Sequence, residues 1–291
     1  MAIELVTKFA PYVDEVFSTE GKSSLVTNKD FDFDGAHAVK VYKVSTGDMY
    51  DYGRSGPAEG QWSRYGVVES LDATTDIYTL SKDRSFTFVI DTLDQDETGQ
   101  ALEAASALAR QIREKVVPEV DTHTFKCISE NAGTKPEAIT LTSENVYGEI
   151  IKGNMALDDA EVPETGRVLV ITPAIYYLMK QCKDIILNTE TGQDMVIKGV
   201  IGNLDGLLVV RVPAARLPKD FGFMIAHPCA TVAPTKLESY MIHSNPPGIN
   251  GTLVEGRIVY DAFVMKNKAK AIYYQANKTA DADATGSGKT E

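Results

Sequence analysis

The sequence has few of the residues that cross-link or anchor a protein. Three cysteines (Cys127, Cys182 and Cys229) occur in 291 residues. A small, odd set spaced this widely predicts a reducing, cytosolic setting without a disulfide framework. No apolar run approaches the roughly 18–20 residues that a membrane helix needs, and the N-terminus lacks the pattern of a signal peptide. We therefore expect a cytosolic protein that does not span a membrane.

Patterns for catalysis and metal binding are also scarce. The four histidines are scattered, and neither Cys-x-x-Cys nor His-Glu-x-x-His occurs, so zinc has no ligand cluster. No Gly-x-Ser-x-Gly turn is present. His227 and Cys229 are separated only by Pro228. Because no other potential ligand lies near these two residues in the sequence, we expect ordinary packing. A Cys–His pair from distant positions stays open, although burial is the expected state of each thiol. We expect no enzyme, no cofactor and no metal.

Two partial motifs have the wrong spacing for a site. Residues 30–35 (Asp-Phe-Asp-Phe-Asp-Gly) match the first half of an EF-hand calcium loop, but Val41 stands where the bidentate Glu belongs. Alternating Phe and Asp is also typical of a strand edge, which we favour. Residues 286–290 (Gly-Ser-Gly-Lys-Thr) resemble the end of a phosphate-binding loop, but Asp283 replaces its first glycine and no helix can follow.

Negative charge is what the chain has in excess. It carries 41 acidic and 29 basic side chains, a formal net charge of −12. Surfaces that bind phosphate backbones need clustered Lys and Arg, so the chain as a whole is a poor nucleic-acid binder, with a local basic patch left open. The carboxylates of Asp158, Asp159, Glu161 and Glu164 are expected to form a solvated acidic stretch. Hydrophobic residues make up 43%, which is ordinary for a globular protein of one large or two ordinary domains.

The N-terminal third predicts an arm and a ribbon. Near residues 9–18, Phe9, Tyr12 and Phe17 recur at the spacing of an amphipathic helix. Nothing nearby in the sequence can cover that apolar face, so the helix must pack on a distant element or on another chain. Residues 38–44 and 76–90 have strand character. They predict an extended two- or three-stranded ribbon.

Residues 45–66, within this ribbon, combine five glycines and Pro57 with aromatic and arginine side chains. A loop this long without periodicity is uncommon inside a compact domain, and aromatic rings and guanidinium groups are enriched at interfaces. We interpret the segment as an interaction arm and not as a mobile surface loop. The candidate contact residues in it are Tyr50, Tyr52, Arg54, Trp62, Arg64 and Tyr65.

A long helix is predicted from about residue 94 to residue 133. Its apolar stripe includes Leu108 and Ile112, while Arg110 and Arg113 lie elsewhere on it and are further contact candidates. Pro118 should kink or break the helix. An element of roughly 35 residues would span about 50 Å at 1.5 Å per residue, which suggests a spine.

From residue 140 the pattern changes to alternating helix and strand. Thr142 is predicted to cap one helix and Thr172 another, which Pro173 begins. Residues 167–171 indicate a buried strand. Further short strands are expected at 196–197, 207–212, 221–225, 254–260 and 270–274. The segment therefore reads as a compact α+β or α/β unit.

This succession of arm, glycine-rich ribbon, spine helix, mixed domain and returning strands resembles the major capsid proteins of tailed bacteriophages with the Hong Kong 97-like fold. Residues 98–104 leading into 110–121 look like the spine helix of that family. Residues 156–173 look like the entry to its axial domain, and residues 254–264 look like the strand pair that closes its peripheral domain. The resemblance covers most of residues 1–275.

The resemblance implies an α+β fold with an extended β-hairpin loop and a long spine helix. The parts expected are an N-terminal arm at 1–35, the extended loop at 36–92, a peripheral domain with the spine helix at 93–139 and 246–275, an axial domain at 140–245, and a disordered tail at 276–291. It also implies a structural protein that self-assembles as pentamers and hexamers into the icosahedral head shell. That shell encloses double-stranded phage DNA without sequence-specific binding.

The resemblance carries further expectations about partners. The subunit belongs in the virion and is assembled in the host cytoplasm. The sequence starts almost directly with the arm, which implies a separate scaffolding protein, and a portal is expected as well. Some relatives crosslink a ribbon lysine to an asparagine, but no lysine occurs between Gly47 and Asp76. That chemistry is not expected here.

Three alternatives stay open from the sequence. The nearest is an encapsulin-type nanocompartment shell, which shares the fold but encloses an enzyme cargo. A second is a cytosolic hydrolase with a lid at 45–66, although the sequence offers no convergent set of titratable groups for it. The third is an unrelated α+β protein whose loop is mobile.

Overall fold

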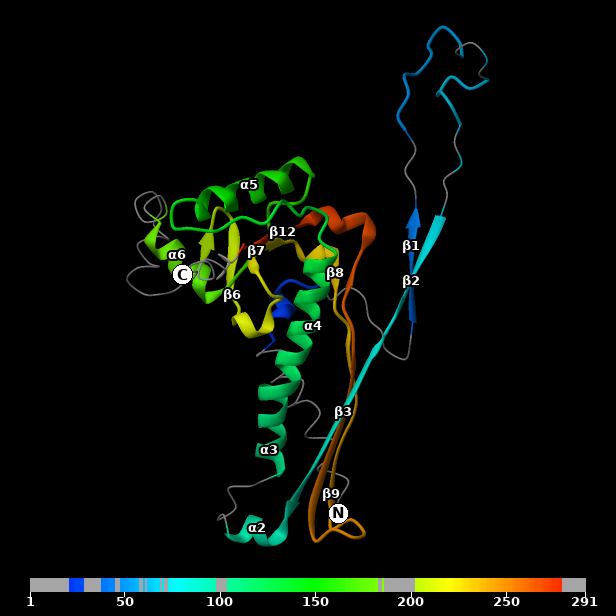
Figure 1. Ribbon diagram of the computed structural model, residues 1–291. Helices are drawn as coiled ribbons and strands as arrows, with labels where there is room; N and C mark the ends of the chain where they lie inside the picture. The colour runs from blue at the N-terminus through cyan, green and yellow to red at the C-terminus, as the bar shows by residue number, and fades with distance from the viewer. Residues whose placement is uncertain are drawn as a thin grey trace, which may run out of the picture. The chain divides into compact units, whose positions relative to one another are not determined.

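The computed structural model divides the chain into two compact units, which are described separately. One is Phe33–Leu80, called the hairpin unit below, and the other comprises Met1–Asp32 and Ser81–Glu291. The helix predicted near 9–18, with Phe9, Tyr12 and Phe17, lies outside the described residues, as do the 30–35 motif, the strand expected at 196–197 and residues 279–291. The structure describes residues 21–28, 38–44, 48–57, 60, 62–68, 70, 73–97, 104–182, 185 and 202–278 (Figure 1).

The hairpin unit contains the predicted ribbon in its two-stranded form. Strands β1 (Ala38–Val44) and β2 (Ala73–Thr79) pair antiparallel, with the first residue of β1 opposite the last residue of β2. The sequence of β1 contains β-branched and aromatic residues, which favour strands. The third stretch with strand character, β3 (Lys82–Asp91), pairs with β10 (Gly251–Tyr260) in the larger unit.

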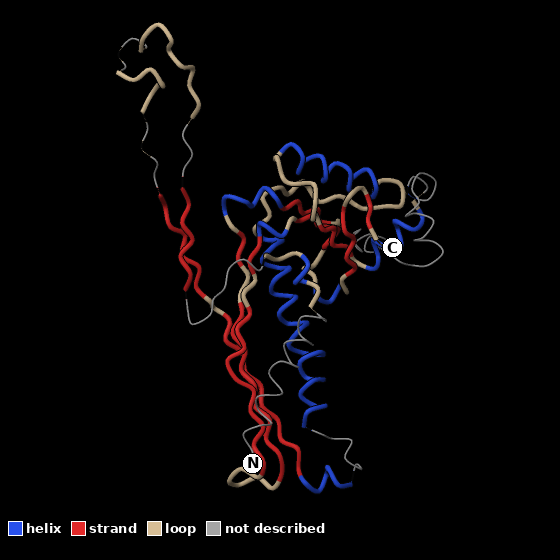
Figure 2. The backbone as a smooth tube through the Cα atoms, turned by 180° about the vertical axis from the view of Figure 1, so that it is seen from behind, coloured by secondary structure: helices blue, strands red, loops and turns tan. Residues whose placement is uncertain are grey.

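The spine helix is present in the larger unit. It runs without a gap through α3 (Ala104–Gln111), a π-helical turn η2 (Ile112–Val116) and α4 (Val117–Glu130). Figures 1 and 2 show these segments as one column. Pro118 was predicted to kink or break the helix, but the helix does not end there, although proline lacks the N–H of the hydrogen-bond ladder. The wider π turn just before Pro118 accommodates the proline ring and the hydrogen bond that proline cannot donate.

A sheet of order β3-β10-β9 lies along this helix, where β9 is Thr235–Ser244. Leu108, Ile112 and Val117 of the helix share a buried cluster with Val254 of β10. Gly256 in β10 is required for this packing, because a Cβ there would overlap the ring of Phe86. The short helix α2 (Thr92–Glu97) follows β3.

Five described strands form a second sheet in the larger unit, in the order β12-β7-β4-β6-β5. Strand β4 pairs parallel with β6 and antiparallel with β7. The strands are β4 (Val168–Ile171), β5 (Asn203–Leu204), β6 (Leu207–Arg211), β7 (Phe221–Ala226) and β12 (Ile272–Ala276). The predicted buried strand at 167–171 and the strands at 207–212 and 221–225 are thereby confirmed.

Helices cover both faces of this second sheet. Leu169 of β4 packs in the cluster that contains residues of α5 (Val146–Asp159) and α6 (Pro173–Gln181). Val168 and Val170 face the opposite way, into a cluster with Phe125 of α4. Because α4 packs against both sheets, it joins the two halves of the larger unit.

The structure corrects one of the two predicted helix caps and confirms the other. Thr142 does not cap α5, which begins at Val146 after Asn145. The Asn145 side chain instead accepts from the Thr142 amide at 2.8 Å, which forms a local turn ahead of the helix. Thr172 does cap α6, since its hydroxyl accepts from the Ile175 amide.

Residues 276–278, which the sequence analysis assigned to a disordered tail, are ordered beside the second sheet. Ala276 ends β12, and the amides of Asn277 and Lys278 donate to the carbonyl oxygens of Asp220 and Ile139. These two bonds extend the edge pairing of the sheet past its last strand. The remaining short elements are η1 (Ser23–Leu25), η3 (Ala214–Arg216), η4 (Pro228–Ala230), β8 (Thr231–Val232), β11 (Phe263–Val264) and η5 (Lys266–Ala271).

Candidate functional site

The tip of the hairpin unit continues the pairing register of its two strands. The Gly53 amide donates to the Arg64 carbonyl oxygen at 2.9 Å. Next to this pair, the rings of Tyr52 and Tyr65 meet edge to face with centroids 5.0 Å apart. Both pairs lie equally far along the chain from β1 and from β2, so they keep the register of the ladder. The segment predicted as an interaction arm therefore has a defined, antiparallel tip.

Aromatic side chains on this tip remain exposed. Trp62 is 83% exposed and Tyr65 is 77% exposed, while Tyr50 and Tyr52 are about half exposed. Arg54 and Arg64 are exposed as well, so all six tip candidates are brought together on one hairpin. Gly66, at φ +92°, lets the two arms approach, because a Cβ there would overlap the side chain of Tyr50.

Other apolar side chains of the hairpin unit, which the sequence analysis missed, share this exposure. Half of the large hydrophobic side chains that are exposed among the described residues belong to this small unit, which is why it stands out as a binding surface. The additional ones are Met49, Val67, Val68 and Ile77. The adjacent pair Val67 and Val68, directly after Gly66, is a sequence signal that could have pointed to this surface.

Arg110 and Arg113, the candidates on the spine helix, lie apart from the tip candidates in the sequence and belong to the other unit. Both are exposed, on the side of the helix away from buried Leu108 and Ile112. Their contact with another subunit stays a prediction.

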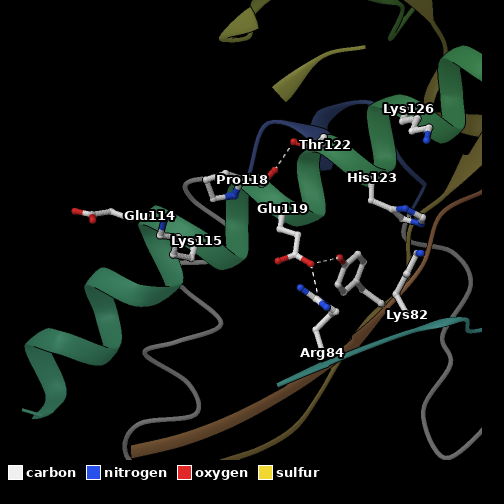
Figure 3. Close-up of a pocket in the computed structure, with 10 residues that line it drawn as sticks. Lys82, Arg84, Glu114, Lys115, Pro118, Glu119, Thr122, His123 and Lys126 are labelled. Carbon is white, nitrogen blue, oxygen red and sulfur yellow. Dashed lines mark hydrogen bonds and ion pairs between the residues drawn. The ribbon is translucent and has the colours of Figure 1, made fainter. Parts of the chain in front are cut away.

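A groove runs between the spine helix and β3, with a volume of about 540 Å³ (Figure 3). Arg84 of β3 donates to Glu119 of the helix at 2.7 Å, and the Tyr260 hydroxyl donates to the same carboxylate at 3.1 Å. Burial, followed by the charge of Glu119, raises the pKa of Tyr260 to about 12. The lining residues are Lys82, Arg84, Glu114, Lys115, Pro118, Glu119, Thr122, His123, Lys126 and Tyr260.

A buried carboxylate closes one end of this region. Asp261 is 7% exposed and accepts from the Ser81 amide at 2.9 Å and from the Ser81 hydroxyl at 2.7 Å. It also pairs with His123 at 2.8 Å and accepts from the Ala262 amide. Burial raises the pKa of Asp261, but these hydrogen bonds outweigh it and hold the pKa below its usual value. The start of β3 is thereby fixed to the end of β10.

A second buried carboxylate holds the N-terminal segment. Asp121 of α4 is 1% exposed and accepts from the amides of Lys22 and Ser23. Arg216 of η3 pairs with it at 2.9 Å. Residues 21–28, part of the predicted arm, are thus packed on their own chain, with Val26 fully buried beside α4.

Arg167 is a structural residue that sequence reasoning missed. The Arg167 side chain is 2% exposed, and its guanidinium donates to the carbonyl oxygens of Val162 and Pro163. It also pairs with Asp158 of α5 at 2.7 Å. Asp158 therefore forms an ion pair with a buried arginine and is not only part of a solvated acidic stretch. An arginine directly before an apolar strand was the available signal.

The cysteines show no sign of activation. Cys182 is buried, and burial raises the pKa of Cys127 to about 11 and raises that of Cys229. His227 accepts from the Cys229 amide and contacts the Thr165 carbonyl oxygen, which is ordinary packing as predicted. Within the described ranges, no group of three or more His, Cys, Asp or Glu residues could hold a metal ion. No described helix is long and apolar enough to cross a membrane.

Known proteins match this chain in structure, whereas the sequence searches found no match. No protein-family model matches the sequence, and the search of curated proteins found no match to it. The structure is similar to that of Mycobacterium phage Che8, with 17% identity, a TM-score of 0.70, and 86% of this chain and 89% of that chain covered. The capsid structure of the cyanophage P-SCSP1u matches at 12% identity and a TM-score of 0.69, with 88% and 87% covered. The chain has the Hong Kong 97-like fold.

The Hong Kong 97-like fold also includes a virus-like particle from Pyrococcus furiosus. That structure matches at 12% identity and a TM-score of 0.55, and 94% of this chain and 100% of that chain are covered. The long helix and the α+β arrangement are therefore shared with shell-forming proteins of very different sequence. At identities this low, the agreement concerns the fold.

Proposed function

We propose that this chain is a major capsid protein, which self-assembles into the icosahedral head shell of a tailed phage. One observation carries the proposal: the chain has the fold of phage capsid proteins over most of its length and of theirs. A subunit of this kind has no active site, because its function lies in surfaces that neighbouring copies complete. Its place is the virion, and the shell would enclose double-stranded DNA.

The hairpin unit supports this proposal on physical grounds. Its tip exposes Trp62 and Tyr65 on an ordered backbone, and large aromatic side chains of this kind are preferred at the centres of interfaces. In the proposed shell, the extended loop at 36–92 lies on a neighbouring subunit. β3, which ends this loop, stays in the sheet beside the spine helix.

The remaining parts are assigned in the same proposal. The spine helix and β10 belong to the proposed peripheral domain at 93–139 and 246–275, and α5, α6 and strands β4 to β7 belong to the proposed axial domain at 140–245. Strands β9 and β12 pair across these bounds, β9 with β10 and β12 with β7. Pentamers and hexamers would then place the axial domains near each capsomer centre. A separate scaffolding protein and a portal are part of the proposal, and they rest on the family resemblance alone.

Negative-stain electron microscopy of the expressed protein tests the proposal. We expect closed shells, tubes or capsomers at high protein concentration. A strictly monomeric species at the same concentration would contradict it. The monomer's folding is verified in parallel by circular dichroism, so that unfolding is not mistaken for a failure to assemble.

A nanocompartment shell is the second candidate function, and the match to the Pyrococcus furiosus particle favours keeping it. The contents of purified particles decide between the two. Nuclease-protected double-stranded DNA in particles from infected cells supports the phage head, whereas a single co-purifying enzyme without DNA supports the nanocompartment. The fold comparisons give no support to the hydrolase alternative with a lid at 45–66.

A further inference from the structure

The groove between the spine helix and β3 is lined mainly by basic side chains, although the chain as a whole is acidic. Four of its lining residues are cationic, on a protein whose formal net charge is −12. Of its two carboxylates, Glu119 is already occupied by Arg84 and Tyr260. Figure 3 shows the side chain of Glu114 directed away from that pair. The remaining charge inside the groove is therefore positive.

Two ammonium groups on facing walls of the groove are available for a partner. Lys82 stands on β3 and Lys115 on the π-helical turn, and neither side chain has a hydrogen-bond or ion-pair partner among the residues that the structure describes. Lys126 lies three helical turns from Lys115 on the same face, about 16 Å along the axis. It makes only a 3.8 Å contact with Glu130, an exposed pair that contributes little.

The partner of such a groove must be anionic, and its geometry favours carboxylates over a nucleic-acid backbone. A duplex needs a stripe of many cations, whereas four cations line this groove and one of them, Arg84, is already paired with Glu119. Carboxylates on short side chains can instead reach individual ammonium groups. The chain itself presents exposed carboxylates, including Asp159 at the end of α5 and Glu161 and Glu164 just after it.

We propose that the groove receives carboxylate side chains from a second copy of this chain, with Lys82 and Lys115 as their partners. The inference rests on the proposed function, because assembly is what brings an acidic neighbour to the groove. Opposite charges on the two partners also set the register of the contact and speed the encounter of copies. Assembly should accordingly weaken as salt rises.

Zero-length crosslinking tests this contact directly. A 1:1 mixture of unlabelled and ¹⁵N-labelled protein is assembled and treated with a carbodiimide, which joins an amine only to a carboxylate in contact with it. We expect Lys82 or Lys115 in peptides linked to Asp or Glu of the differently labelled copy. Lys152 is the internal control, since its 2.7 Å pair with Glu149 should crosslink within one chain.

Charge reversal provides the second measurement. The double variant Lys82→Glu/Lys115→Glu should need a roughly tenfold higher protein concentration to assemble, because two attractions become repulsions. Lys152→Glu is the matched control and should assemble like the unmodified protein. The free energy of unfolding of each variant shows whether the monomer is intact, so a folding defect is recognised as such.

The outcomes separate this inference from the function on which it rests. If the unmodified protein forms no particles, the proposed function fails, and the groove contact fails with it. If particles form but Lys82 and Lys115 link to no carboxylate of another copy, only the groove contact is wrong. Lysines that react freely in empty shells and are protected only in DNA-filled ones would assign the groove to phosphate and overturn the inference.

Discussion

Two buried charged side chains hold backbone segments together: Asp261 links segments that are distant in the sequence, and Arg167 fixes the turn that precedes its own strand. Each makes several charge-assisted hydrogen bonds to backbone groups, and such bonds are about twice as strong as neutral ones. Removing either side chain would leave buried donors or acceptors without partners. That loss, more than the ion pair itself, determines the cost of a substitution.

Asp261→Asn should lower the free energy of unfolding by about 2–3 kcal/mol at pH 7, because a carboxylate that accepts four hydrogen bonds is lost. The folded-state pKa of Asp261 lies below its ordinary value. Its contribution is therefore complete above that ordinary value, near pH 4, and is lost as pH falls through the lower folded pKa. Urea unfolding at several pH values measures the difference between the two proteins.

The matched control for Asp261 is Asp83→Asn, which removes an exposed carboxylate paired with Arg257. Its pKa is also lowered, mainly by the hydrogen bond from Arg257, but water screens the pair. We expect a much smaller change in stability. An equal loss in both variants would contradict the role given to burial.

Arg167→Met should lower the free energy of unfolding by about 2–4 kcal/mol, because the carbonyl oxygens of Val162 and Pro163 lose their donor inside the protein. Lys152→Ala, which removes an exposed helix pair, should change it by less than about 0.5 kcal/mol. Urea denaturation of the three proteins measures both effects. A cost for Arg167→Met as small as that for Lys152→Ala would show that the junction is not structural.

At the scale of elements, α5 offers a test of how closely a helix packs on the second sheet. Gly153 faces the sheet, and a Cβ there would lie 2.9 Å from Ile225 and 3.0 Å from the ring of Tyr273. Gly148, five residues earlier in the same helix, faces open space. The two positions therefore separate helix propensity from overpacking.

Gly148→Ala should stabilise the protein by up to about 1 kcal/mol, because alanine is the better helix former. Gly153→Ala should destabilise it by about 1–3 kcal/mol, because the buried Tyr273 ring cannot move away freely. Thermal unfolding of both variants gives the comparison. Stabilisation by both substitutions would mean that α5 is not in close contact with the sheet.

Some helices and strands could be predicted from the sequence, and others could not. The apolar run at 168–171 and the Thr172-Pro173 start identified β4 and α6, because these signals are local. The partner of β3 could not be predicted, since pairing with β10 depends on packing against a helix and on Gly256. The contacts of Asp121 and Arg167 could not be predicted either. The partners of Asp121 are distant in the sequence, and Arg167 binds backbone carbonyl groups.

At the scale of the whole molecule, the hairpin unit is the part whose exposed apolar side chains need a partner outside it. Trp62→Ser should leave the free energy of unfolding almost unchanged, since the indole is mostly exposed. It should nevertheless raise the concentration needed for assembly by on the order of tenfold or more, as expected for a central aromatic contact. Light scattering during assembly measures the effect.

Tyr177→Ser, which removes an exposed aromatic ring of α6, is the matched control for Trp62→Ser. We expect it to affect assembly less, because this ring is not part of the aromatic group on the hairpin tip. Equal effects of the two substitutions would mean that the hairpin has no special place among the contacts.

The central claim is that copies of this chain complete one another in a closed shell. A cryo-electron microscopy reconstruction of the assembled particles tests it most directly. We predict an icosahedral shell of pentamers and hexamers in which the hairpin unit of each copy lies on a neighbouring copy, with Trp62 and Tyr65 covered there. A shell in which the hairpin contacts only its own chain, or a protein that stays monomeric at every concentration, would contradict the account.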